Sequence, residues 1–340
     1  MRPSQSTAAG HALYRALKAE LEQAGCFRPT PWRTSAYLLL VLITYLTCFA
    51  VLLLDPGVAP RISALATLAF TSVHAGFIAH EASHGAIARD RRLAEAIGHV
   101  FDTFLIGLCF SYHRHNHRLH HWHCNEEAAD PDIQSDLVSL YEGAARRTRG
   151  GGRVVSRRQA WLIWILIWLQ GFKIKSDGLE LLRRDPGATR ADQAILVLHV
   201  ALWFGPPVVL LGFGDALLNY LLLTLLAGPY LGIVLLVNHI GTPTVRPDCD
   251  VPFLERQLGG TRNLGASRLD DFVFGGLNNH IEHHLFPSMP TARLRAARPI
   301  TRAFCRRHGL PYRETSWLGA AREVSSHLQA MSRFVPEGAA

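Results

Sequence analysis

Three histidine clusters hold the side chains of this sequence that are best suited to chemistry. They read HEASH at residues 80–84, HRLHH at 117–121 and HIEHH at 280–284. Residues three or four positions apart lie on one face of an α-helix, so each cluster would present two or three imidazoles on one side of a helix. The histidines at these positions are His80, His84, His117, His120, His121, His280, His283 and His284.

The type and number of these side chains predict a metal centre. A closed zinc site uses four ligands, so eight imidazoles suit two metal ions. Imidazole binds zinc, copper, nickel and iron, and imidazole ligation with positions left open for oxygen fits non-haem iron. Residue type and spacing therefore favour two metal ions without naming the metal. Asn125, Asp130 and Asp132 follow the second cluster, and any of them could accept an imidazole N–H and so fix a ligand.

Two other kinds of protein would use part of this pattern. A single HExxH motif is typical of zinc hydrolases, in which the histidines bind zinc and the glutamate is the general base. An intramembrane zinc protease would use His80, Glu81 and His84 in this way, but it has no use for six further clustered histidines. A count of bound metal would identify it. The second alternative is a metal carrier without enzymatic activity, whose iron would not turn over with oxygen and a reductant.

Apolar segments surround the histidine clusters and must position them. Almost half of the residues, 49%, are hydrophobic, and a run of about 20 apolar residues is long enough to span a bilayer. Two shorter apolar runs, residues 96–110 and the tryptophan-rich 160–172, fit interfacial or re-entrant helices better than spans. The four long runs are residues 35–54, 62–78, 194–213 and 216–237.

Short turns at residues 55–57 and 214–215 separate the first long run from the second and the third from the fourth. The sequence therefore predicts an all-α integral membrane protein with four transmembrane helices in two hairpins, interfacial helices and a histidine-rich cap. We expect three parts. An amphipathic N-terminal segment, 1–34, lies with its helix on the membrane surface. A membrane domain, 35–240, carries the first two clusters, and a C-terminal cap, 241–340, carries the third.

Charge predicts the orientation of the chain. The formal net charge is +8, and lysine and arginine concentrate in residues 89–190 and in the C-terminal tail, whereas the two short turns offer only Arg61. The positive-inside rule therefore places both termini and all three clusters in the cytosol. A basic surface suits membrane lipids or an acidic protein partner. Nucleic acid is not an expected partner, because no recognition motif accompanies the arginines, and the six scattered cysteines predict no disulfide framework.

The clusters, read with their flanking residues, resemble the boxes of the membrane fatty acid desaturase superfamily, specifically its acyl-lipid type. The matching motifs are HEASHG, HNHRLHHWHCN followed by DPD, NHIGT and GGLNNHIEHHLFP, and the resemblance runs from about Tyr37 to Tyr312. It implies a di-iron centre of two Fe ions that activates O2. Carried over position by position, the implied metal ligands are His80, His84, His117, His120, His121, His239, His280, His283 and His284. Among them, His239 in NHIGT resembles the additional histidine that this family places at the end of its last membrane helix.

The resemblance also implies the reaction, in which hydrogens are removed from adjacent methylenes of a fatty acyl lipid or acyl thioester. We expect the electrons to come from an external donor of the ferredoxin or cytochrome b5 type. No flavin or nicotinamide fingerprint is present, and no HPGG motif of a fused cytochrome b5 precedes the first apolar run. The spacing of the first box and His280 at the start of the third favour an acyl-lipid or bacterial enzyme, in the bacterial inner membrane. The alternative is a lipid hydroxylase or a carotenoid ketolase or hydroxylase with nearly the same boxes.

Overall fold

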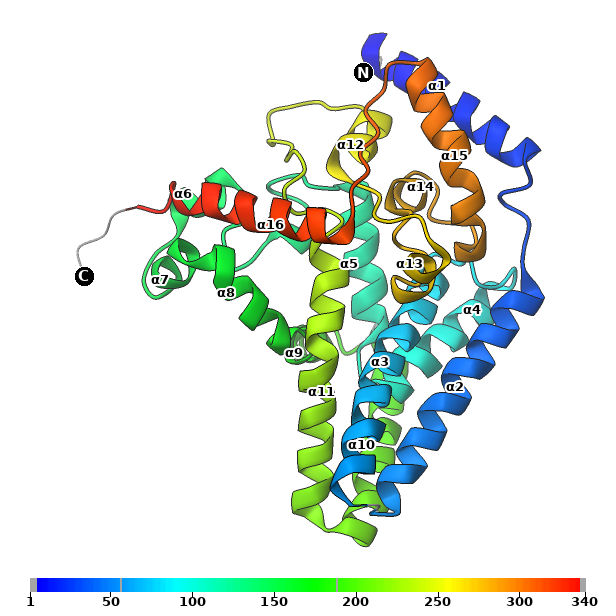
Figure 1. Cartoon of the computed structure of the whole chain (residues 1–340), viewed down its shortest axis with the longest axis vertical. Coiled ribbons are helices and arrows are strands. Elements are labelled where there is room, and N and C mark those ends of the chain that lie inside the picture. Colours follow the sequence, from blue (N-terminus) through cyan, green and yellow to red (C-terminus); the bar gives the residue numbers. More distant parts are fainter. Residues whose placement is uncertain (1–4, 56, 188, 337–340) are drawn as a thin grey trace. The chain divides into compact units, whose positions relative to one another are not determined.

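The computed structural model describes residues 5–55, 57–187 and 189–336 (Figure 1). Every regular element in these ranges is a helix, and the only β-type pairings among them are two isolated bridges, Glu126 with Val245 and Asn263 with Glu314. The predicted all-α class is therefore confirmed. In chain order the elements are α1 (Gln5–Gln23), α2 (Pro31–Leu53), α3 (Val58–Ser83), α4 (Arg91–Gly98), the π-helix η1 (His99–Leu105), α5 (Phe110–Trp122), η2 (Pro131–Ile133), α6 (Glu142–Arg147), α7 (Gly152–Arg157), α8 (Gln159–Leu166), η3 (Ile167–Leu169), α9 (Gln170–Arg184), α10 (Arg190–Leu211), α11 (Phe213–Leu236), α12 (Phe253–Gly260), α13 (Arg268–Val273), α14 (His280–Leu285), α15 (Thr291–Arg307) and α16 (Trp317–Ser332).

Four of these helices, α2, α3, α10 and α11, are long and apolar enough to cross a membrane. They coincide with the four long apolar runs, so this part of the prediction is confirmed. Only 22% of the most apolar stretch of α2 and 17% of that of α10 are buried by protein. Large apolar side chains on the outside of a protein are stable where lipid replaces water, and the exposed faces of α2 and α10 therefore fit a membrane protein.

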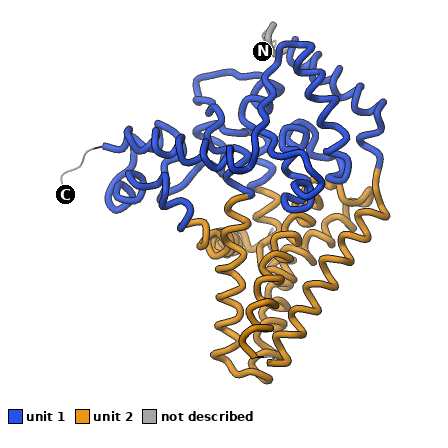
Figure 2. Tube along the Cα trace, viewed as in Figure 1, with its two compact units in different colours: residues 1–28, 116–165, 234–340 blue, residues 29–115, 166–233 orange. Residues whose placement is uncertain are grey.

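Contacts within the chain divide it into two compact units (Figure 2). Unit 1 contains residues 1–28, 116–165 and 234–340, and unit 2 contains residues 29–115 and 166–233. Unit 2 holds α2, α3 and α10 with most of α11, whereas unit 1 is assembled from three stretches of chain that unit 2 interrupts. The predicted three-part division of the chain at residues 34 and 240 follows membrane location rather than contacts, and it stays a prediction.

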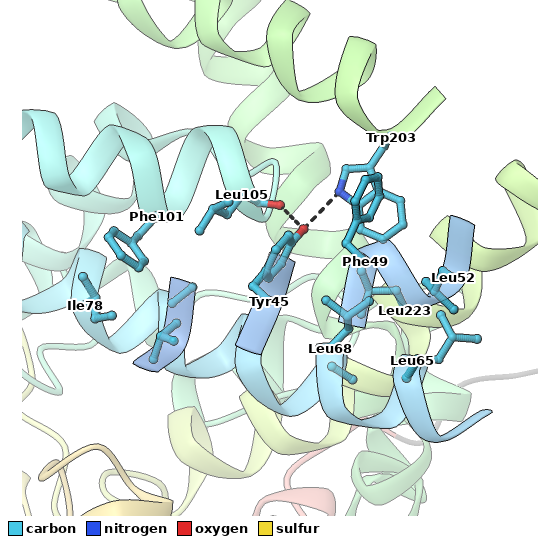
Figure 3. Close-up of a cluster of buried hydrophobic side chains, with 14 residues drawn as sticks. Tyr45, Phe49, Leu52, Leu65, Leu68, Ile78, Phe101, Leu105, Trp203 and Leu223 are labelled. Atoms are coloured by element: carbon cyan, nitrogen blue, oxygen red, sulfur yellow. Dashed lines mark hydrogen bonds between the residues drawn. The ribbon is translucent and has the colours of Figure 1, made fainter. Parts of the chain in front are cut away.

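The core of unit 2 is built between its apolar helices (Figure 3). The Tyr45 side chain of α2 is fully buried, and its hydroxyl donates to the backbone oxygen of Leu105 and accepts a hydrogen bond of 3.0 Å from Trp203 Nε1 on α10. Buried phenol and indole groups normally require such partners. Tyr45 therefore joins α2 to α10 and to the end of η1, while Phe49 and Leu68 pack beside it.

The first short apolar run is broken rather than straight. The segment α4–η1 and helix α5 meet at an angle of 115°, which fits either a re-entrant segment or a broken span. Gly107 lies in the break with φ +69°, and a Cβ atom there would overlap the imidazole of His199. The Lys175 ammonium donates to the backbone oxygens of Ile106 and Gly107, which supplies partners for carbonyls that the end of a helix leaves without any.

Helix α1 buries its apolar residues against other helices of unit 1. Its apolar residues Leu17 and Leu21 are fully buried within unit 1, where α1 packs against α12 and α15. The leucine stripe on which the predicted membrane-surface position rested is therefore covered by protein, and that position stays a prediction. The same fourfold spacing of leucines suits a protein groove as well as a lipid surface, and spacing alone does not distinguish the two.

Candidate metal centre

Unit 1 brings seven of the predicted ligands together. The second cluster forms the last turns of α5, the third makes up most of α14, and His239 lies in the turn that follows α11. The seven residues are His117, His120, His121, His239, His280, His283 and His284. The remaining two predicted ligands, His80 and His84, belong to unit 2, where they end helix α3 with ring centroids 5.0 Å apart.

The imidazoles of unit 1 converge on two points. At the first, the Nε2 atom of His121 lies 2.9 Å from that of His117 and 3.1 Å from that of His283. At the second, the Nε2 atom of His239 lies 3.2 Å from that of His120 and 2.7 Å from that of His280. Two nitrogens bound at about 2.1 Å to one metal ion lie roughly 3.0–3.4 Å apart. The spacing at both points therefore resembles that of ligands sharing an ion.

Hydrogen bonds behind the second group fix which nitrogen faces inward. His120 donates from Nδ1 to Asp130 at 2.9 Å, and His239 donates from Nδ1 to the backbone oxygen of Gly260 at 3.0 Å. His284 donates from Nδ1 to Gln257 Oε1 at 2.9 Å. A neutral imidazole carries one N–H, so His239 and His284 turn a lone pair inward at Nε2, and His120 does so once it has lost its second proton. Partners of this kind are typical of the residues around metal-binding histidines.

These bonds create an electrostatic conflict that a cation resolves. If both rings were neutral, His120 and His239 would face each other with two lone pairs across 3.2 Å in a buried position, so without a metal ion His120 keeps a second proton between the two rings. The Nε2 atom of His284 is also buried, and it has no hydrogen-bond partner within the described part of the chain. Buried polar atoms without partners are costly. Metal ions at these points would satisfy all three nitrogens, so the residues fit a histidine-bound metal centre, and a histidine-rich group able to bind metal is present.

The groups that accept the Nδ1 protons of His120, His239 and His284 were only partly predicted from the sequence. Of the three candidates after the second cluster, Asp130 is the acceptor for His120, whereas the side-chain amide of Asn125 donates to Thr242 and Gly260 instead. Gln257 had no signal in the sequence, because it lies 27 residues before His284 on another helix. The Gly260 acceptor is a backbone oxygen, which no residue type identifies.

Changing Asp130 to asparagine is expected to weaken metal binding by about 10- to 100-fold. The two carboxylate oxygens of Asp130 accept three N–H groups, from His120, Asn125 and Asp132. An asparagine NH2 group would turn a donor toward one of these donors. Fe(II) titration of the purified variant checks this. Asp132→Asn is the control, because the Asp132 carboxylate is 43% exposed and 3.6 Å from His120 Nδ1. Equal affinities of the two variants would contradict the role of Asp130.

Burial and charge set the protonation of the second group. Burial lowers the pKa of His280 to about 3 and lowers the pKa of His239 and His284 well below the ordinary value. These three imidazoles are therefore neutral near pH 7 and can bind a metal. Burial also acts to lower the pKa of His120, but the nearby charge of Asp130 outweighs it and raises that pKa to about 9.

Metal affinity is therefore expected to fall as the pH is lowered from about 9. Below its pKa of about 9, His120 holds a proton that a metal ion must displace, so the affinity should fall by up to about tenfold per pH unit. His280, with a pKa of about 3, adds no such competition near neutral pH. Fe(II) affinity measured between about pH 6 and pH 9 checks this. An affinity that does not change across this range would contradict proton competition at His120.

Comparison with known proteins identifies the family of this chain. The model of the family described as "Fatty acid desaturase" matches residues 56–316. The chain belongs to the fatty acid desaturase family. This match confirms the resemblance seen in the histidine motifs, and together with the relatives below it indicates an oxidoreductase.

Curated relatives of this desaturase-family chain carry desaturase names. It is 25% identical over 323 residues to a "Delta(8)-fatty-acid desaturase" of Borago officinalis, covering 90% of this chain and 72% of the relative. It is 24% identical over 325 residues to an "Acyl-lipid (9-3)-desaturase" of Physcomitrium patens, covering 88% and 60%. It is 28% identical over 339 residues to an "Acyl-lipid 8-desaturase" of Rebecca salina, covering 94% and 74%. These relatives are eukaryotic, so they do not support the predicted bacterial origin of this desaturase.

Proposed function

We propose that this chain is a membrane-bound di-iron desaturase that introduces a C=C bond into a fatty acyl chain. The overall change would be –CH2–CH2– + O2 + 2 e⁻ + 2 H⁺ → –CH=CH– + 2 H2O. The acyl chain would be carried by a membrane lipid or a thioester, and the two electrons would come from an external donor of the ferredoxin or cytochrome b5 type. The strongest support is the pair of points in unit 1 at which imidazole Nε2 atoms from different elements converge.

The proposed ligands are the nine histidines named in the sequence analysis. Two irons bound by them would supply the activation of O2. His117, His121 and His283 would hold one ion from unit 1, and His120, His239, His280 and His284 would surround the other. His80 and His84 join the set through the family motif HEASHG. Asp130, Gln257 and the Gly260 oxygen would orient the second group by holding its Nδ1 protons.

The proposed topology follows from charge and turn length. The helices α2 and α3 would form one transmembrane hairpin, and α10 and α11 would form the other. The positive-inside rule would then place both termini and the histidine boxes in the cytosol. This orientation would give a soluble electron donor access to the centre, while the acyl chain stays in the bilayer.

Accurate-mass lipid analysis tests the proposed reaction. Cells would express the chain with a ferredoxin and its reductase, or with cytochrome b5 and its reductase, and matched cells would carry the His283→Ala variant. Lipids lighter by two hydrogens only with the intact chain would support desaturation, and the position of the new double bond would follow from fragmentation. Lipids heavier by one oxygen would assign the chain to the lipid or carotenoid oxygenases, the alternative on the same scaffold. No change in any lipid, with both donors and iron present, would contradict both activities.

A further inference from the structure

Helix α14 carries the third histidine box under unusual conditions. It has six residues, His280–Leu285, and all six are buried. A helix this short has little stability of its own, and its first-turn N–H groups need partners from outside the helix. It also contains Glu282, a fully buried carboxylate between His280 and His283. A buried carboxylate costs free energy unless hydrogen bonds compensate for the lost water. The contacts that supply this compensation therefore also hold α14 in place.

The Glu282 carboxylate forms a closed ring of hydrogen bonds with two other side chains, Asn263 and Tyr312. The side-chain amide of Asn263 donates to Glu282 Oε2 at 2.8 Å and to the Tyr312 hydroxyl at 2.9 Å. The Tyr312 hydroxyl in turn donates to Glu282 Oε1 at 2.7 Å. Every donor and acceptor in the ring has a matching partner, so the arrangement admits only one orientation of the Asn263 amide.

That orientation lets Asn263 cap the helix. With its NH2 group turned toward Glu282 and Tyr312, its Oδ1 atom accepts the backbone N–H of Ile281 at 2.8 Å. Ile281 N–H belongs to the first turn of α14 and would otherwise be a buried donor without a partner. Asn263 therefore binds α14 twice, once at its amino end and once at its only carboxylate.

The backbone around the ring is itself fixed. Asn263 N–H donates to the oxygen of Arg313 at 2.9 Å, and Thr315 N–H donates to the oxygen of Asn263 at 3.0 Å. The Glu314 carboxylate, between these two residues, accepts from the buried guanidinium of Arg298 at 2.8 Å. The two segments of chain that carry Asn263 and Tyr312 are therefore attached to each other by backbone hydrogen bonds beside the ring.

We infer that Asn263 and Tyr312 are positioning residues that hold the third histidine box in its metal-binding geometry by acting on Glu282. This inference rests on the proposed metal centre. Neither residue touches a metal, and their effect would pass through the position of α14, which carries His280, His283 and His284. Ligands must be held closely to bind a metal tightly, so loosening α14 should lower metal affinity before it unfolds the chain.

The first test removes one hydroxyl. Tyr312→Phe in the full chain is expected to lower the affinity for Co(II), measured by its visible absorption, by about tenfold or more. Tyr141→Phe is the control, because Tyr141 is a buried tyrosine of unit 1 whose hydroxyl donates to Gln134 and accepts from Arg147, away from the ring. If both variants bind Co(II) like the wild type, or if both lose it equally, the inference is overturned.

The second test exchanges hydrogen-bond donors and acceptors within the ring. Glu282→Gln replaces one carboxylate oxygen by an NH2 group, which faces either the NH2 group of Asn263 or the donating hydroxyl of Tyr312, so one hydrogen bond of the ring is lost in either orientation. Asn263→Asp turns a carboxylate toward the carboxylate of Glu282. Each single variant is therefore expected to lower Co(II) affinity by about tenfold or more. In the double variant, the carboxylate introduced by Asn263→Asp can accept from the amide introduced by Glu282→Gln and still cap Ile281. Two of the three side-chain contacts are then restored.

Rescue in the double variant would support positioning, because a general loss of stability would grow with the second change. The inference is overturned if the Co(II) affinity of the double variant is no higher than that of the single variant with the lower affinity. The wild-type chain separates this question from the proposed function. If wild type binds neither Co(II) nor Fe(II), the metal centre itself is refuted, whereas a wild type that binds and variants that do not differ refute only the role of the ring.

Discussion

The His283→Ala variant is expected to retain at most about one iron per chain and to form no unsaturated product above background. His283 is buried, and its Nε2 atom lies 3.1 Å from that of His121 at the first point of convergence. Loss of one ligand from a small set leaves an ion with too few strong bonds. Iron content of the purified protein and accurate-mass analysis of cellular lipids measure the two effects.

The control for this variant is His123→Ala. His123 follows the second box directly, but its ring is 36% exposed and pairs with Glu126. We expect this variant to keep its iron and its activity. Membrane insertion and the elution volume in detergent should be the same for both variants, because neither residue lies in a transmembrane helix. Full iron and activity in His283→Ala would contradict the assignment of the third box as a metal ligand.

Replacing Gly228 with alanine is expected to destabilise the membrane part of the chain. Gly228 lies within α11, where the backbone of η3 approaches closely, and a Cβ atom would lie 2.8 Å from the backbone oxygen of Ile167 and closer still to that of Trp168. Backbone cannot move aside as a side chain can, so the helices must separate. Overpacking of this kind costs about 1–3 kcal/mol, and small residues that permit close helix contact are common in membrane proteins.

Gly205→Ala provides the comparison. Gly205 lies within α10, and a Cβ atom there would meet nothing within 4 Å. Alanine favours helix over glycine by about 1 kcal/mol, so this variant should be neutral or slightly more stable. Thermal unfolding in detergent, followed by the fraction that remains soluble, compares the two variants. Equal midpoints would contradict the close approach of η3 to α11.

The sequence predicted those parts of the molecule that depend on local pattern. The runs that became α2, α3, α10 and α11 are apolar for long enough to span a bilayer. The histidine boxes were visible because helical spacing alone brings His117 and His121 onto one face. The match to the fatty acid desaturase family then confirmed the resemblance that these motifs had indicated.

What the sequence missed depends on contacts between distant residues. Gln257 and Asn263 support the candidate centre only because the chain returns to bring them beside α14. Neither residue has a distinctive neighbourhood in the sequence. The packing of α1 was missed for a related reason. Helices α12 and α15, against which it packs, lie more than 200 residues later in the chain, and a leucine stripe does not reveal what it packs against.

The interrupted order of unit 1 has a consequence for biosynthesis. The seven histidines of its two converging groups occur at residues 117–121, at 239 and at 280–284, and helices α10 and α11 lie between the first and the later of these. The histidines at 117–121 are therefore synthesised long before those at 239 and 280–284, and both apolar helices are made before the seven histidines are complete. The complete set of imidazoles exists only after residue 284 has been made, and nascent chains that end before residue 280 lack part of both converging groups.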